Sequence, residues 1–181
     1  FVPYFLQVLH LQTPLVAGYI AALMAAGWTL GALYSSGLAL ASANRAICCG
    51  PVFVVSGLAL AAVCVPQSGS SLISLTGVSL AMIGVGTGIG LAWPHLLTRV
   101  LANVPDSEKD IAGASITTVQ LIATAIGAAL AGMIANMAGL SAPGGVEGAA
   151  NAAAWLFGLY AVLSALLFIT VRQVIAHSAK R

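Results

Sequence analysis

The chain has 181 residues, of which 60% are hydrophobic and 6% are charged, and its mean hydropathy is +1.05. A soluble domain carries about 25% charged residues, so this composition excludes a soluble enzyme, and it also excludes a disordered chain, which would be poor in apolar residues. The formal net charge of +2 is too small for a nucleic-acid-binding surface. The composition therefore predicts a protein that crosses a lipid bilayer several times.

Hydrophobic runs separated by short polar or turn-forming stretches divide the chain into six predicted spans. The first run, residues 1–9, is far shorter than the roughly 20 residues of a full span, so we expect the chain to begin inside a transmembrane helix of a longer protein. The others are predicted at residues 14–41, 46–65, 72–101, 111–137 and 152–175. Each is longer than the ~10 residues of a transmembrane strand and lacks strict alternation, so the sequence predicts a single all-α transmembrane bundle.

The basic residues are distributed unevenly between the links that join these spans. If successive spans alternate in direction, the links at 42–45 and 103–110 lie on the same side as the C-terminal tail. All six basic residues belong to that side: Arg45, Arg99, Lys109, Arg172, Lys180 and Arg181. The links on the opposite side, 10–13, 66–71 and 139–151, contain none. Because Lys and Arg are enriched on the cytoplasmic side, we predict a cytoplasmic C-terminus and an outward-facing 139–151 link.

The fourth span carries a glycine at every second position of the segment GVGTGIG. These glycines are Gly84, Gly86, Gly88 and Gly90. The segment lacks the preceding strand and the GK[ST] ending of a phosphate-binding loop, so we interpret it as two interleaved GxxxG pairs that let neighbouring helices approach closely. Pro94 follows, removes a helical hydrogen bond and is predicted to bend the span.

Other side chains of the fourth span allow a prediction about its faces. Bulky residues lie opposite the small and polar ones, and we expect these bulky residues to contact lipid: Val78, Met82, Val85, Ile89 and Leu96. His95 could titrate, or its imidazole could bond a neighbouring helix. The second interpretation is favoured because no acidic partner lies nearby in the sequence.

The fifth span has the clearest division into two faces. Thr117, Gln120 and Thr124 fall on one stripe at 100° per residue, and bulky Ile and Met residues fall on the other side. A buried amide has a free-energy cost unless it is hydrogen-bonded or hydrated. Gln120 is therefore expected either to bond a neighbouring helix or to line a cavity.

Polar and aromatic side chains within the spans are the candidates for a substrate cavity. They are Gln7, Trp28, Tyr34, Thr117, Gln120 and Thr124. All four acidic residues fall in predicted links, and no combination of nucleophile and base and no cluster of metal ligands is apparent. The sequence therefore predicts no catalytic site, no metal and no cofactor. Any coupling carboxylate is expected in an N-terminal part of the protein.

Four segments resemble a known family in their order and spacing. PYFLQVLH at 3–10 and TPLVAGY at 13–19 are similar to the junction of spans seven and eight in major facilitator superfamily transporters, above all the fourteen-span drug:proton antiporters. GVGTGIGLAWP at 84–94 resembles that family's glycine-rich span, and DIAGAS at 110–115 resembles the start of its penultimate span.

This resemblance implies the C-terminal six-helix half of a transporter, with its first helix truncated. Its partners would be the lipid bilayer, an N-terminal transporter half and a small-molecule substrate, and its location would be the bacterial plasma membrane. The implied activity is proton-coupled efflux of amphipathic compounds by alternating access. The alternative is a structural or scaffold membrane subunit that transports nothing. Polar stripes on several helices favour transport, whereas stripes of small residues alone favour a scaffold.

Overall fold

The computed structural model describes residues 1–38 and 40–178, and within them it contains helices and no strands. The helices are α1 (Val2–Leu9), α2 (Pro14–Ser36), α3 (Leu40–Cys64), α4 (Leu72–Ala102), the short 3-10 helix η1 (Asp106–Glu108), α5 (Lys109–Met137) and α6 (Gly145–Ser178). Five segments among the described residues, all except α1, are long and apolar enough to cross a membrane. The fold is thus an all-α bundle with the composition of a multi-pass membrane protein.

The helix boundaries at two links differ from those expected from the sequence. α2 ends at Ser36 and α3 already begins at Leu40, so residues 42–45, expected to form a turn, are helical. Ala43 and Arg45 are good helix formers, and only Gly37 interrupts the pattern strongly. α6 begins at Gly145 and not at 152, because alanines continue the helix towards its start and Glu147 complements the helix dipole in the first turn.

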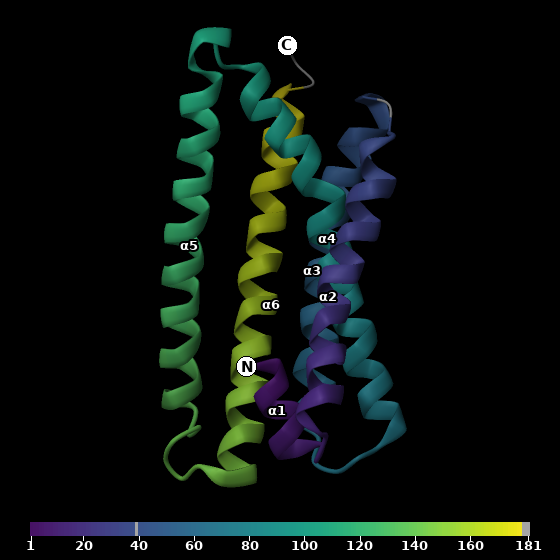
Figure 1. The fold of residues 1–181 in the computed structure, drawn as a ribbon, viewed down its shortest axis with the longest axis vertical. Coiled ribbons are helices and arrows are strands. Elements are labelled where there is room, and N and C mark those ends of the chain that lie inside the picture. Colours follow the sequence, from purple (N-terminus) through teal and green to yellow (C-terminus); the bar gives the residue numbers. More distant parts are fainter. Residues whose placement is uncertain (39, 179–181) are drawn as a thin grey trace.

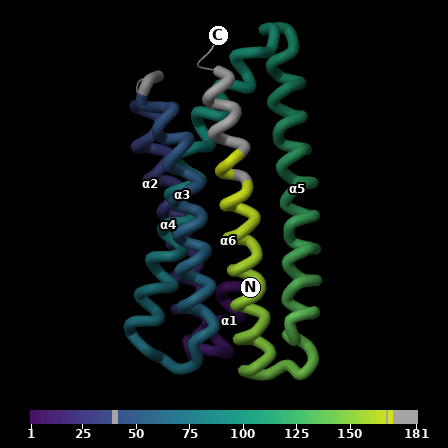
Figure 2. The backbone as a smooth tube through the Cα atoms, turned by 180° about the vertical axis from the view of Figure 1, so that it is seen from behind, coloured from purple at the N-terminus to yellow at the C-terminus, as the bar shows by residue number. Residues whose placement is uncertain are grey.

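α4 lies between α2 and α3 in the bundle. It packs along α2 on one side and α3 on the other, and α3 in turn packs on α6 (Figures 1 and 2). α1 is short and lies against α2 and α6. α5 stands apart from this group, since its contacts are mainly with α6.

The hydrophobic core gathers at the end of the bundle that carries the α1–α2, α3–α4 and α5–α6 links. Phe5 of α1 meets Phe157 of α6 edge to face, with ring centroids 6.2 Å apart. Val78 and Met82 of α4 are buried in the same core. The expectation that these two side chains, together with Val85, contact lipid is wrong, because α4 has neighbours on two sides and Val85 is also buried.

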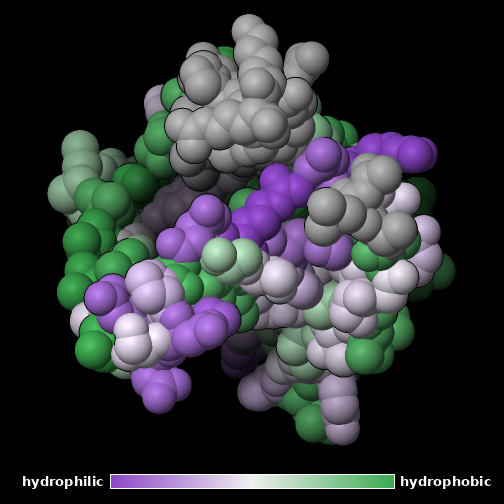
Figure 3. Space-filling model, turned by 90° about the horizontal axis from the view of Figure 1, so that it is seen from above, coloured by the Kyte–Doolittle hydropathy of each residue, from purple (hydrophilic) through white to green (hydrophobic). Residues whose placement is uncertain are grey.

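Hydrophilic residues gather at the opposite end of the bundle, with hydrophobic residues around them (Figure 3). Arg99 of α4 donates to the side-chain oxygen of Asn44 of α3, and Lys109 pairs with Asp106 at 2.5 Å. Lys180 and Arg181 lie outside the described residues, and the side chain of Arg172 is not described. The described basic side chains thus lie at or near the links of one end.

This charge distribution leads to a test of orientation. Ser107 and Ser141 are both exposed and lie in the links at opposite ends of the bundle. We expect Ser107→Cys to be labelled by thiol reagents only from the cytoplasm and Ser141→Cys only from outside, in a background without Cys48, Cys49 and Cys64. Impermeant maleimide applied to intact cells measures this, and labelling of both positions from one side would contradict the alternating topology.

Candidate functional site

The glycines of α4 bring its backbone against α2. A Cβ atom at Gly86 would lie 2.8 Å from the backbone nitrogen of Trp28, and one at Gly90 would lie 2.8 Å from that of Ala32. Both distances are shorter than real Cβ contacts, so only glycine fits at these positions. The close approach permits backbone Cα–H···O contacts along the two helices.

The second glycine pair faces the other neighbour. A Cβ atom at Gly88 would lie 2.9 Å from the backbone nitrogen of Val54 in α3. One at Gly84 would lie 3.7 Å from the Cα of Gly57, an ordinary van der Waals distance. The two GxxxG pairs therefore lie against different helices, with the tightest contacts at Gly86, Gly88 and Gly90. α2, α3 and α4 form one closely packed unit, which we call the glycine-packed body.

A polar connection joins α2 to α4 beside Pro94, which lies inside α4. The Ser35 hydroxyl donates to the Leu91 carbonyl at 2.7 Å, and the Nε2 of His95 lies 2.7 Å from the same Ser35 oxygen. A serine hydroxyl has one proton, so Nε2 of His95 must donate to Ser35. The interpretation that the His95 imidazole bonds a neighbouring helix is therefore confirmed.

The three candidates on α5 are exposed and have no side-chain bond to another helix among the described residues. Thr117 donates to the Gly113 carbonyl at 3.2 Å, and Thr124 donates to the Gln120 carbonyl at 2.8 Å. Both bonds lie within α5 itself. The Gln120 side chain is exposed and bonds no neighbouring helix among the described residues.

The orientation of this stripe follows from the contacts farther along α5. Tyr160 of α6 donates to the Gly127 carbonyl at 2.8 Å, and Ala131 and Ala135 pack into the core. At 100° per residue, Gln120 lies on the same face as these three positions. The stripe therefore faces the side of the bundle on which α6 lies. In this part of α5, α6 does not cover the stripe.

The other candidates lie on different helices. Gln7 of α1 is exposed and donates to the Pro3 carbonyl at 3.0 Å. Trp28 and Tyr34 of α2 are 40% and 70% exposed. Among the described residues, no hydrogen bond links these side chains to the α5 stripe.

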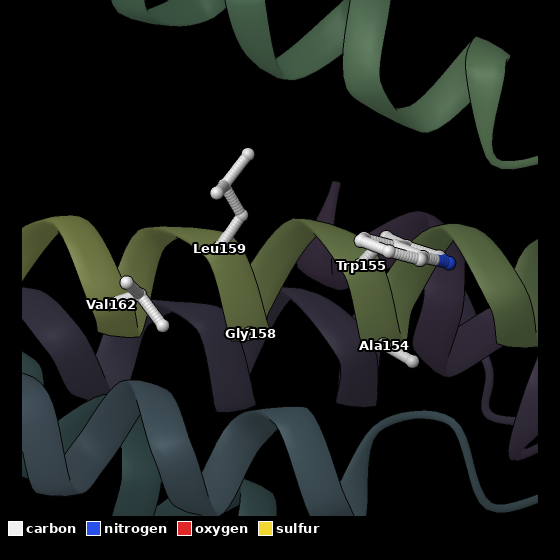
Figure 4. A pocket seen from close by; sticks show the side chains of 5 residues that line it. All are labelled: Ala154, Trp155, Gly158, Leu159 and Val162. Atoms are coloured by element: carbon white, nitrogen blue, oxygen red, sulfur yellow. The ribbon is translucent and has the colours of Figure 1, made fainter.

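A shallow apolar hollow of about 390 Å³ lies on α6. Its lining comes from that helix alone: Ala154, Trp155, Gly158, Leu159 and Val162. Leu159 projects toward α5, the Trp155 ring lies along α6, and Ala154 and Val162 point away from α5 (Figure 4). No pattern singled out in the sequence indicated this hollow. The described residues contain no cluster that could hold a metal ion.

These features define the class of the protein: an integral, multi-pass membrane protein with a glycine-packed body and one loosely attached helix. The chain is 39% identical over 169 residues to proteins of two Mycobacterium tuberculosis strains, CDC 1551 and H37Rv, each named "Probable multidrug-efflux transporter". The match covers 92% of this chain and 33% of each relative, so the chain spans about a third of the length of the curated relatives it matches. No family model matches the chain, and no solved structure does. Bacterial relatives fit a plasma-membrane location.

Proposed function

We propose that the chain is part of a transporter that exports small amphipathic molecules. The observation that carries this proposal is the stripe of Thr117, Gln120 and Thr124, which is turned to the bundle and remains open. A ligand cavity of this kind has mostly apolar walls and a few polar groups that orient the ligand. The names of the mycobacterial relatives support the same activity.

The finer proposal is that the chain forms the C-terminal half of a major facilitator superfamily transporter, as its motifs suggest. Alternating access would then rock this half against an N-terminal half around a site near the middle of the membrane. The glycine-packed body suits such a movement, because close backbone packing lets α2, α3 and α4 move as one unit. α5 would line the substrate path beside it.

Proton coupling is part of this proposal, with the coupling group placed outside the chain. Proton pathways in membranes commonly use buried carboxylates. Among the described residues, the acidic side chains lie in a link or in the first turn of a helix: Asp106, Glu108, Asp110 and Glu147. A coupling carboxylate would therefore belong to the N-terminal half.

Ethidium accumulation in a bacterium that lacks its own efflux pumps tests the proposal. We expect the longer protein that contains this chain to lower accumulation several-fold, and this chain expressed alone to insert into the membrane without lowering it. Expressing the N-terminal part together with this chain should restore some efflux. Efflux by the isolated chain would contradict the half-transporter assignment, and abundant but inactive longer protein would favour a scaffold.

A further inference from the structure

The exposed side of α3 is a continuous, mostly apolar stripe that ends at a basic residue. At 100° per residue, the described side chains of α3 that are exposed all fall on one side of the helix: Arg45, Cys49, Val52, Phe53, Ser56, Ala59, Leu60 and Val63. We call these residues the α3 stripe. Its one hydroxyl group, on Ser56, donates to the Phe53 carbonyl of the same helix at 3.1 Å, so it needs no other partner in lipid. The α3 stripe is therefore suited to contact acyl chains along its whole length.

The length of the α3 stripe matches the thickness of a bilayer. From Arg45 to Val63 the helix rises about 27 Å at ~1.5 Å per residue, and the hydrocarbon core of a bilayer is about 30 Å thick. When Val63 lies at one edge of this core, Arg45 lies at the level of the phosphate groups on the other side. That side is the one expected to be cytoplasmic from the distribution of basic residues.

Arg99 of α4 brings a second guanidinium to the same end of α3. It donates to the side-chain oxygen of Asn44, the residue that precedes Arg45. This bond holds the half-buried Arg99 side chain against the first turns of α3, beside the exposed Arg45. A guanidinium has five N–H donors, so the bond to a single neutral oxygen leaves Arg99 with donors for an anion.

No carboxylate neutralises these two arginines among the described residues. The one ion pair found there joins Lys109 to Asp106 in the link between α4 and α5. Arg45 and Arg99 therefore place two uncompensated positive charges at the end of an apolar stripe. Guanidinium groups bind phosphate oxygens through paired N–H donors, which makes an arginine pair at headgroup level a good phosphate ligand.

We propose that the α3 stripe, Arg45 and Arg99 together bind an anionic phospholipid. Its phosphate lies at the two guanidiniums, and its acyl chains lie along the apolar part of the α3 stripe. Charge complementarity selects the headgroup, and the apolar surface that continues from Arg45 favours a lipid over a soluble anion. The link at the other end of the α3 stripe, residues 65–71, contains no basic residue, so a lipid at that end meets no such charge. This site does not depend on the proposed transport activity.

Quenching of tryptophan fluorescence by brominated phospholipids tests which lipid contacts each end of the α3 stripe. The reporter would be Cys49→Trp, one turn from Arg45, in the longest form of the protein that inserts stably and with all other tryptophans replaced by Phe. We expect phosphatidylglycerol to be favoured over phosphatidylcholine beside this reporter by about fivefold for each arginine that it contacts. Leu60→Trp lies at the matched depth near the other end of the α3 stripe, and there the two lipids should quench equally.

Two charge substitutions separate this site from the general attraction of a basic surface. Arg45→Gln should lower the preference for phosphatidylglycerol about fivefold. Lys109→Gln removes the same charge from the same end of the bundle, but that ammonium is already paired with Asp106, so the preference should not change. Inorganic phosphate, added at constant ionic strength, should not release the lipid.

Three results would overturn the proposal. Equal quenching by both lipids at the Cys49→Trp reporter would show that the arginines do not bind a lipid and would favour a carboxylate elsewhere in the longer protein as their partner. An equal loss of preference in Arg45→Gln and Lys109→Gln would assign the effect to the surface potential. Release by inorganic phosphate would identify a site for soluble anions. If Arg45→Gln does not insert, the comparison of the two reporters alone decides.

Discussion

Gly86→Ala is expected to separate α2 from α4 and to lower the melting temperature of the protein markedly. The added Cβ would lie 2.8 Å from the Trp28 backbone nitrogen, and backbone atoms cannot yield as a flexible side chain can. Overpacking of this kind costs about 1–3 kcal/mol, which exceeds the gain of ~0.5–1 kcal/mol from replacing a helical glycine by alanine. Thermal unfolding in detergent micelles measures the difference.

Gly84→Ala is the matched control, because it lies two residues away on the same helix. Its Cβ would meet α3 at 3.7 Å, an ordinary contact, so the melting temperature should stay the same or rise slightly. Equal melting temperatures for the two variants would contradict the assignment of Gly86 to the tight contact with α2.

The pairing of these glycines illustrates what the sequence can predict. Glycines spaced four apart predict close helix packing, and the two-residue offset between the pairs predicts two different partners. The sequence does not show which pair tolerates a side chain. That depends on the distance between the helix backbones, at Gly57 of α3 for one pair and at Trp28 of α2 for the other. Both of these residues lie far from the α4 glycines in the sequence.

The incorrect lipid face of α4 has a related physical cause. A stripe of bulky residues predicts a lipid contact only for a helix with one packed face, and α4 has two. Val78 and Met82 therefore fill the core between neighbours. The burial of His10 was equally inaccessible from the sequence, because its partner Val65 follows 55 residues later and belongs to a different link.

For the α5 stripe, the sequence predicted which residues share a face and left the role of Gln120 open. Periodicity fixes relative directions along one helix but says nothing about how close the next helix comes. The structure supplies that distance through Tyr160, which holds α5 at Gly127 and not at Gln120. Periodicity alone therefore cannot choose between a contact with a neighbouring helix and a cavity wall for Gln120.

Gln120→Ala should weaken substrate affinity about tenfold, or change the range of substrates, with little effect on stability. One hydrogen bond contributes about 0.5–1.5 kcal/mol, and 1.4 kcal/mol corresponds to tenfold in affinity. The Gln120 amide is exposed and bonds no other helix among the described residues. Its removal therefore breaks no hydrogen bond between described helices, and stability should change little. Transport kinetics and melting temperature of the longer protein should be measured side by side.

Thr118→Val provides the comparison for Gln120→Ala at the same depth of α5. Thr118 lies about 200° around the helix from Gln120, and its hydroxyl bonds only the Ala114 carbonyl of its own helix, at 3.0 Å. On the opposite face it should touch lipid or a neighbouring surface and not substrate, so transport kinetics should remain unchanged.

If Gln120→Ala lowers the melting temperature and leaves the substrate profile intact, the amide supports packing in the complete protein and the α5 stripe is not a cavity wall. If both variants impair transport equally, the effect belongs to the helix as a whole, and the direction assigned to the stripe is wrong.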